Sequence, residues 1–288
     1  MYPPELSQPP AWRVEKDFLG EREVPSTAYY GIHTLRAFEN FSITARKVPQ
    51  EVIKAFAIIK KSAAIANGKS GEIAESLVGA MISACDEIVK EKFLEEFILD
   101  PLQGGAGTAT NMNVNEVIAN RANEILGFPL GSYSPIHPLD HANRGQSTND
   151  VFPTAVRIAA IWDLRELIDE VTKLYEALKL KEVEFSAILK IGRTQLQDAV
   201  PITLGAEFSA YAEAISRDKW RLFRIEERLR VLNLGGTAIG TSINASRDFQ
   251  LELINALRDE TGIALSRAEN LVEATQNADI FSEVSGSL

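Results

Sequence analysis

The residues best suited to chemistry lie in a glycine- and asparagine-rich stretch, residues 104–116. Its glycines let backbone amides approach a ligand closely, and its threonine and asparagine side chains add neutral donors. Apolar residues recur at helical spacing after Asn113, and Asn113 and Glu116 have the spacing of a capping box, which predicts a helix that begins here and ends near Gly127. Free amides at such a start favour an anion. An ordinary turn and helix cap would explain the same residues.

Three further segments repeat this composition, and each precedes a stretch with a helical pattern. They are residues 146–150, 192–201 and 234–242. For any one of them, capping is the simpler interpretation. Together they offer small neutral donors with almost no acid, so helix ends that meet in a bundle could hold carboxylates. A well-placed donor to a developing oxyanion contributes ~3 kcal/mol.

Composition limits the partners and the compartment. The chain has 288 residues, 45% apolar and 24% charged, which is typical of a globular protein with one large or two medium domains. Its net charge of −10 argues against nucleic acid and against an anionic membrane surface. Cys85 is the single cysteine, so no internal disulfide can form. With no basic N-terminal region and no long apolar run, the sequence predicts a cytoplasmic protein with no membrane partner.

The apolar pattern predicts a mainly α fold. Helical stripes are expected at residues 50–67, 74–97, 154–191, 206–234, 248–261 and 267–288, with a short hairpin within residues 12–43. Segments longer than ~25 residues indicate a bundle that also packs against other subunits. The predicted organisation is a loose arm (1–11), an N-terminal helical domain with short irregular or β segments (12–146), and a central long-helix domain, incomplete (147–288).

The remaining candidates for chemistry are weaker. His137 and His141 are four residues apart, but Pro138 lies between them and no acidic or cysteine partner has the spacing of a zinc site. His33 is expected to be packed or solvated rather than catalytic. No nucleotide loop and no Gly-x-Ser-x-Gly nucleophile turn occurs. We therefore predict neither a metal nor a cofactor.

Five segments in the same order resemble the aspartase/fumarase superfamily: residues 17–25, 29–34, 104–116, 146–150 and 192–201. The resemblance runs from about Arg13 to the last residue. Three details favour the aspartate ammonia-lyase branch over class II fumarases: Gln-Gly-Gly-Ala-Gly-Thr at 103–108, Ser-Thr-Asn at 147–149, and Gln195, where fumarases and some aspartases carry a histidine. Imidazole is the side chain best suited to proton exchange near neutral pH, so its absence at this position makes a hydration reaction less expected.

The resemblance implies reversible elimination of ammonia from L-aspartate to give fumarate. It also implies roles for particular side chains. The residues expected to hold the two substrate carboxylates are Thr108, Ser147, Thr148, Asn149 and Thr194. Gln195 would lie near the amino group, and residues 137–140 align with a secondary dicarboxylate site of fumarases. The family forms homotetramers in which each site draws on three chains.

The resemblance assigns no catalytic residue within this chain. In the family the base is a serine on a Gly-Ser-Ser loop, followed by a Met-Pro-x-Lys-x-Asn pattern, and neither occurs in these 288 residues. The fold is therefore expected to be truncated within its central domain, with little or no lyase activity for these residues alone. Two alternatives stay open: a class II fumarate hydratase, and a non-catalytic helical assembly fragment.

Overall fold

The computed structural model describes residues 11–104 and 106–288. The predicted arm, residues 1–11, falls almost wholly outside them. The chain divides into two compact units: unit 1 contains the residues up to Ala159 and Val231–Asn277, and unit 2 contains Ala160–Arg230 and Ala278–Leu288. The fold is mainly α, as predicted. The predicted boundary between the N-terminal domain and the central domain, after residue 146, stays a prediction. The two units describe how this one chain packs and do not test that boundary.

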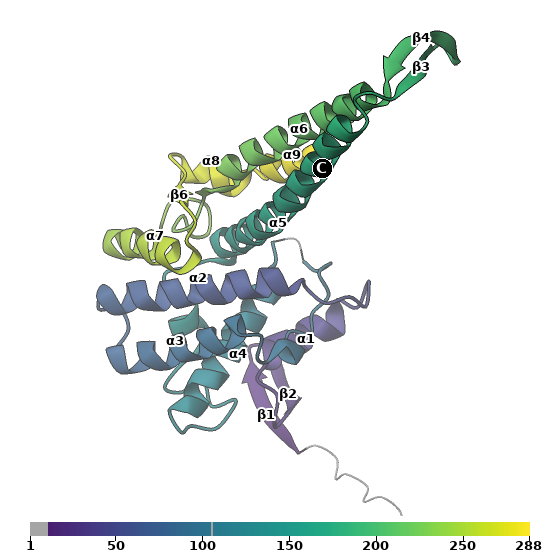
Figure 1. The fold of residues 1–288 in the computed structure, drawn as a ribbon. Helices are drawn as coiled ribbons and strands as arrows, with labels where there is room; N and C mark the ends of the chain where they lie inside the picture. Colours follow the sequence, from purple (N-terminus) through teal and green to yellow (C-terminus); the bar gives the residue numbers. More distant parts are fainter. Residues whose placement is uncertain (1–10, 105) are drawn as a thin grey trace, which may run out of the picture. The chain divides into compact units, whose positions relative to one another are not determined.

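Unit 1 contains the β1–β2 hairpin, a group of helices and a minimal parallel pair of strands (Figure 1). Its elements are β1 (Trp12–Asp17), β2 (Gly20–Pro25), α1 (Ile32–Asn40), α2 (Gln50–Lys69), α3 (Glu75–Val89), the 3-10 turn η1 (Leu94–Glu96), α4 (Thr108–Ile125), the π-turn η2 (Pro138–Ala142), the beginning of α5 (Thr148–Glu184), β5 (Val231–Leu232), α7 (Arg247–Thr261), β6 (Ser266–Arg267) and α8 (Leu271–Gln276). The hairpin expected within residues 12–43 is confirmed.

The core of unit 1 forms around α2, which packs against α3, α4 and α7. Its apolar residues repeat every three or four positions and are almost fully buried, as at Ile53, Phe56 and Ile59. Burial of each such side chain contributes about 2 kcal/mol. The helix ends where the Ser70 amide bonds to Ala66 O and Gly71 takes a left-handed conformation, φ 75°.

Helix α4 is buried but rich in asparagine, because its side-chain amides bond to backbone groups of neighbouring loops. Asn123 exchanges two hydrogen bonds with the backbone of Ile136, at 2.8 and 2.9 Å. Asn120 donates to Tyr29 O and accepts from Gly131 N. Buried backbone groups of a loop must find partners, and α4 supplies them from its side chains.

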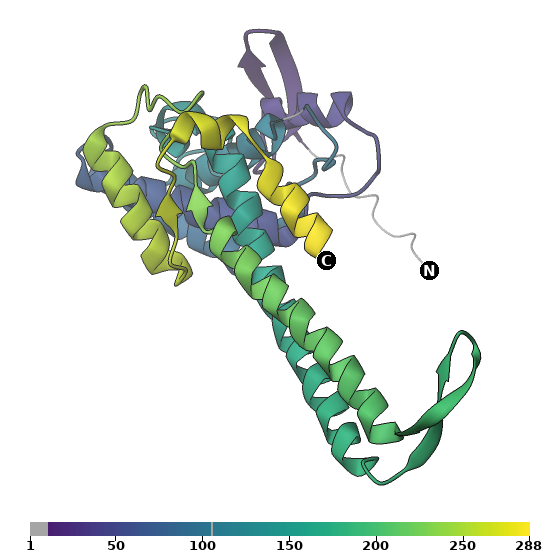
Figure 2. The same ribbon diagram turned by 90° about the horizontal axis from the view of Figure 1, so that it is seen from above.

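Unit 2 is an antiparallel helix pair with a hairpin at one end (Figure 2). It contains the rest of α5, β3 (Leu189–Thr194), β4 (Gln197–Thr203), α6 (Leu204–Leu229) and α9 (Asp279–Ser287). The Phe185 and Phe208 rings meet near the hairpin with centroids 5.3 Å apart. Large apolar side chains along this pair remain exposed in the chain taken alone, among them Leu180, Val183 and Trp220.

Several bounds of the predicted helices are wrong. The helix predicted over 74–97 ends at Val89, with a 3-10 turn at Leu94–Glu96, and the helix predicted over 206–234 ends at Leu229, before β5. The helix predicted to reach residue 191 ends at Glu184, and the apolar residues beyond it form β3. The helix predicted over 267–288 is interrupted at Asn277, which is extended, so α8 and α9 are separate. Helix α4 begins at Thr108 rather than after Asn113. Among the described residues, no helix is long and apolar enough to cross a membrane.

Candidate functional site

The starts of α4 and α5 lie against each other in unit 1. Gly107, the N-cap of α4, has φ 74°, a left-handed conformation that favours glycine. A Cβ at this position would lie 2.1 Å from the ring of Phe152, in the first turns of α5. Glycine therefore permits the close approach of the two helix starts. Thr108, the first residue of α4, is exposed beside this junction.

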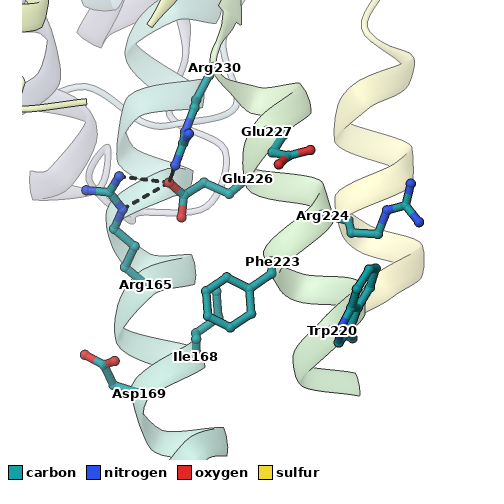
Figure 3. A pocket seen from close by; sticks show the side chains of 9 residues that line it. All are labelled: Arg165, Ile168, Asp169, Trp220, Phe223, Arg224, Glu226, Glu227 and Arg230. Carbon is teal, nitrogen blue, oxygen red and sulfur yellow. Dashed lines mark hydrogen bonds and ion pairs between the residues drawn. The ribbon is translucent and has the colours of Figure 1, made fainter. Parts of the chain in front are cut away.

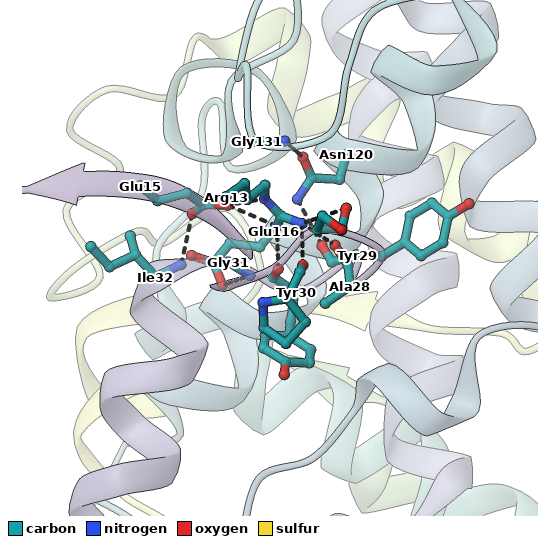
Figure 4. Close-up of polar contacts among 12 residues, drawn as sticks. Arg13, Glu15, Ala28, Tyr29, Tyr30, Gly31, Ile32, Glu116, Asn120 and Gly131 are labelled. Carbon is teal, nitrogen blue, oxygen red and sulfur yellow. Dashed lines mark hydrogen bonds and ion pairs between the residues drawn. The ribbon is translucent and has the colours of Figure 1, made fainter. Parts of the chain in front are cut away.

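The capping box predicted at Asn113 and Glu116 is wrong, because Glu116 caps a different helix. Its carboxylate accepts hydrogen bonds from the amides of Gly31, His33 and Thr34, at 2.9–3.1 Å, and from Thr34 Oγ1 at 2.6 Å. These are the free donors at the start of α1 (Figure 4). Burial raises the pKa of Glu116 to about 7, although the bonds from Thr34, His33 and Gly31 act in the opposite direction.

The β1–β2 hairpin is fastened to the same region by Arg13. Its guanidinium donates to the carbonyls of Pro25, Ala28 and Tyr30 at 2.7–2.8 Å and pairs with Glu15 (Figure 4). This cluster shapes the loop before α1. It contains none of the residues predicted to bind substrate.

A capping box does exist at the start of α5. Ser147 Oγ accepts the Asn149 amide at 3.2 Å, and Asp150 Oδ1 accepts the Ser147 amide at 3.0 Å. The other oxygen of Asp150 accepts the amides of Gly235 and Thr237, at 3.1 and 2.9 Å. One buried carboxylate therefore holds both the helix start and the glycine loop at 234–242.

Asn149 makes two further contacts with the glycine loop at 234–242 and the residue before it. Its side-chain amide donates to Ala238 O at 2.7 Å, and its carbonyl accepts from Asn233 Nδ2 at 3.0 Å. The polar segment 146–150 and the glycine-rich segment 234–242, both noted in the sequence, are thus joined in the fold.

A buried network of side-chain amides is hydrogen-bonded to Thr148. Asn111, on α4, donates through Nδ2 to Thr148 Oγ1 at 3.0 Å and to Asn143 Oδ1 at 3.1 Å. Asn143 Oδ1 also accepts from Asn115 Nδ2, at 3.3 Å, and from Lys60 Nζ, at 2.9 Å. Lys60 is completely buried on α2.

Burial perturbs the two ionisable groups of this junction. It lowers the pKa of Lys60 to about 7, with Asp150 acting in the opposite direction. It raises the pKa of Asp150 to about 6, against the effect of the three backbone amides and of Lys60. Low polarity disfavours the charged form of each group, which explains the opposite directions.

Thr194 and Gln195 belong to unit 2, whereas Thr108 and Ser147–Asn149 belong to unit 1. Thr194 is the last residue of β3, and Gln195 and Leu196 form the two-residue turn to β4. Both turn residues have positive φ, 50° and 62°, and are exposed. Segment 192–201 precedes a helix, as predicted, since α6 begins at Leu204. Thr194 and Gln195 nevertheless belong to an antiparallel ladder and its turn rather than to the helix start.

Two cavities matter for the site. A polar cavity of about 600 Å³ in unit 1 is lined by residues that lead directly into the α5 start, including Asn143, Arg144 and Gln146, and by Ser246 of the N-cap of α7. A second cavity, of about 640 Å³, lies between α5 and α6 in unit 2, where Glu226 pairs with Arg165 and Arg230 (Figure 3). None of the six predicted substrate-binding residues lines either cavity. We place the candidate site beside the first, because Gln146 in its wall directly precedes Ser147 at the start of α5.

The side chains of His137 and His141 accept hydrogen bonds from backbone amides, and His33 is exposed. His137 caps η2, with Nδ1 accepting from the amides of Leu139 and Asp140 at 3.2 and 3.3 Å, and its own amide donates to His141 Nδ1. Among the described residues, no group of three or more His, Cys, Asp or Glu side chains could hold a metal ion. A dicarboxylate role for residues 137–140 stays a prediction.

The sequence interpretation missed Lys60, Asn111, Asn143 and Asp150 as parts of the site. A signal existed for Lys60, which lies four residues after Phe56 and three before Ala63, on the buried stripe of α2. A signal existed for Asp150 too, because Ser147 and Asp150 have capping-box spacing. Asn111 lies in the stretch 104–116 whose asparagine donors the sequence singled out, but its partners could not be predicted because its contacts are long-range. Asn143 gave no signal.

Comparison with known proteins identifies the family of the chain. A family model described as "Lyase" matches residues 20–288, and the chain belongs to this family and, with it, to the aspartase/fumarase superfamily.

Individual proteins and solved structures of known name are also similar to this chain. The aspartate ammonia-lyase of Bacillus subtilis is 48% identical over 277 residues, which cover 96% of this chain and 58% of that protein. Among solved structures, a fumarate lyase:delta crystallin from Brucella melitensis bound to cobalt is 48% identical with a TM-score of 0.94, and a class II fumarase from Schistosoma mansoni is 35% identical with a TM-score of 0.93. Each alignment covers 96% of this chain, and 61% and 62% of those two chains. The chain thus spans less than two thirds of these proteins.

Proposed function

We propose that this chain contributes the dicarboxylate-binding part of an aspartate ammonia-lyase, which converts L-aspartate reversibly into fumarate and ammonia. A base removes the proton from Cβ, its electron pair forms the carbon–carbon double bond, and the Cα–N bond breaks as ammonia leaves. The observation that carries the proposal is the junction of the α4 and α5 starts, where Thr108 and the Ser147–Asn149 donors share one region beside a polar cavity.

The roles proposed for these residues follow from the chemistry. Loss of the Cβ proton places negative charge on the neighbouring carboxylate, and donors already aimed at that group stabilise it. Thr108, Ser147, Thr148 and Asn149 are the donors proposed for unit 1. Because the base-bearing loop of the family is absent from these 288 residues, the chain alone is expected to bind dicarboxylates with little or no turnover.

The proposal includes a homotetramer in which Thr194 and Gln195 come from another copy. The hairpin turn exposes Leu196 completely, and apolar residues of α5 and α6 are uncovered in the single chain. Such surfaces are typical of protein interfaces. A homotetramer in sedimentation experiments supports this part, and a well-folded monomer contradicts it. The cytoplasmic setting expected from the lone cysteine remains a prediction.

Binding of L-aspartate, fumarate and L-malate to the purified chain, measured by isothermal titration, tests the proposal. We expect L-aspartate and fumarate to bind, and Thr148→Ala to weaken both by about tenfold, the effect of one hydrogen bond to a charged group. Thr172→Ala, the same change on α5 at a residue that bonds only within its own helix, is the matched control.

Each alternative has a distinct outcome. Preferential binding of L-malate, with fumarate formed from malate but not aspartate, would favour the hydratase. An assembled oligomer that binds none of the three compounds would favour the non-catalytic scaffold. The 45–48% identity to proteins named aspartate ammonia-lyase and the presence of Gln195 favour the lyase.

A further inference from the structure

A lysine with no carboxylate partner lies below the candidate site. Lys60 has no solvent exposure, and its ammonium donates to Asn143 Oδ1 at 2.9 Å. Within residues 11–104 and 106–288, this is its only hydrogen bond, and no carboxylate lies within 4.0 Å of it. Buried lysines are rarely kept unpaired, because desolvation disfavours the charge. A structural explanation alone would predict an apolar residue at this position of α2.

The ammonium is linked to the α5 start by three hydrogen bonds. Asn143 Oδ1 accepts from Lys60 and from Asn111, and Asn111 donates in turn to Thr148 Oγ1, with distances of 2.9–3.1 Å. The linking groups are neutral amides, so they do not cancel the charge. Asn111 Oδ1 is itself buried and has no partner among the described residues.

We propose that the buried Lys60 supplies the positive charge that the starts of α4 and α5 need to bind a dicarboxylate. This inference rests on the proposed function. The chain carries a net charge of −10, and the donors at the two helix starts are neutral. Lys60 is covered by the network, so it acts on the ligand through Thr148 and through its field. It is a positioning residue rather than a catalytic one.

The charged groups around Lys60 make it responsive to an anion. The Asp150 carboxyl and the Cys85 thiol are the ionisable groups that act on it, and burial raises the pKa of Cys85 so that the thiol stays neutral. The pKa of Lys60 lies near 7, so a fraction of the lysine is neutral at physiological pH. An anion bound above Thr148 favours the ammonium and draws a proton onto it.

Within the described part of the chain, the acids on the other elements packed on α2 pair with other residues. On α3, Asp86 pairs with Lys61 at 2.8 Å, and on η2, Asp140 lies 3.3 Å from His137 Nδ1. Helix α4 faces it with the amides of Asn111 and Asn115. On α7, Glu260 pairs with Lys61 at 2.6 Å and Glu252 with Lys69 at 2.8 Å. Asp150 titrates near pH 6, below the range in which Lys60 changes charge.

Proton uptake on ligand binding tests the inference, because a merely structural lysine does not produce it. Fumarate and succinate are titrated into the unsubstituted chain at several pH values above 7, in buffers of different ionisation enthalpy. We expect fractional proton uptake, and an affinity that falls by about tenfold as Lys60 loses its charge. Acetate, which has one carboxylate, shows both effects more weakly.

Variants assign the proton to Lys60. Lys60→Arg keeps the charge without titrating, so it should bind fumarate with no proton uptake and no change in affinity over this range. Lys60→Met should bind about tenfold more weakly at neutral pH. Lys69→Met, the same change on the exposed part of α2, should behave like the unsubstituted chain. Circular dichroism and thermal melting establish that each variant is folded; if the Lys60 variants do not fold, the titrations of the unsubstituted chain decide.

The outcomes separate this inference from the proposed function. Fumarate binding without proton uptake, or uptake that persists in Lys60→Arg, overturns the role of Lys60 and leaves the lyase proposal standing. No dicarboxylate binding at any pH overturns the proposed function and this inference with it.

Discussion

Two polar segments that look alike in sequence, residues 146–150 and 192–197, are built in opposite ways. In the first, Asp150 is buried and accepts three backbone amides, and Thr148 is bonded to Asn111. In the second, the turn of Gln195 and Leu196 projects from a two-stranded hairpin and is exposed. One half of the proposed site is therefore supported within its own unit, and the other half is an exposed turn.

The difference has a physical origin in where the backbone donors go. The start of α5 leaves free amides that require acceptors, and Ser147 and Asp150 supply them within the chain. The hairpin satisfies its backbone by pairing β3 with β4, so its turn needs no side-chain support. Substitutions in the first segment should therefore affect stability and binding together, and substitutions in the second should affect binding alone.

The largest expected effect follows from Asp150→Ala. The change leaves the amides of Ser147, Gly235 and Thr237 without their acceptor in a buried region, so we expect the free energy of unfolding of unit 1 to fall by about 4 kcal/mol. Hydrogen exchange of unit 1 amides measures it. The control is Asp198→Ala on the hairpin, where the ion pair with Arg193 is exposed and the expected change is within about 0.5 kcal/mol. Equal losses in both variants would remove the contrast.

The sequence predicted the helices well where one apolar stripe dominates. Residues 50–67 correspond to α2 and residues 248–261 to α7, each within two residues at both ends. The pattern failed at Ile188, Leu189 and Ile191, because a short apolar run fits a strand as well as a helix. The hairpin there depends on the pairing of β3 with β4, which local propensity does not encode.

The site was predictable only in part, for a related reason. The sequence located polar segments at the starts of α4 and α5 but misplaced the first helix start, since α4 begins at Thr108 rather than after Asn113. The substrate contacts of Thr108 and Ser147 stay predictions. The burial of Lys60 and Asp150 depends on α2, α5 and the 234–242 loop coming together from distant parts of the sequence. Glu116 shows the same limit, since its spacing predicted a local cap whereas it caps α1 from α4.

A second prediction concerns the pH dependence of stability, which should differ between Glu116 and a carboxylate beside the hairpin. The folded-state pKa of Glu116 is raised from 4.5 to about 7, so the folded protein binds the proton more tightly than the unfolded chain. Stability should therefore be lost as pH rises from about 4.5 to about 7. In Glu116→Gln this component is absent, and we expect the difference in unfolding free energy between the two proteins to change by about 2 kcal/mol across that range. Denaturant titrations at each pH measure it, with Glu207→Gln beside the hairpin as the control.

A third, smaller effect distinguishes a residue that supports the proposed site from a residue proposed to contact the ligand. Asn111→Ala removes the hydrogen bonds to Thr148 and Asn143, and we expect about 1.5 kcal/mol lower stability together with weaker fumarate binding. Gln195→Ala should weaken L-aspartate binding with no change in stability, because Gln195 is exposed. Thermal melting and calorimetric titration of both variants measure the two quantities. A loss of stability in Gln195→Ala would show that the turn is supported within its own chain.

The smallest effect concerns the backbone of the hairpin turn itself. Leu196 has φ 62° and its side chain is fully exposed, a conformation in which glycine avoids the steric cost of a Cβ. Leu196→Gly should therefore stabilise the isolated hairpin by about 0.5 kcal/mol, seen as slower hydrogen exchange in β3 and β4. Leu196→Ala keeps the Cβ and should give no such gain. If Leu196 contacts a second copy, the glycine variant should also weaken assembly in sedimentation experiments. A leucine that can be replaced without any change in assembly would place the partner contact elsewhere on unit 2.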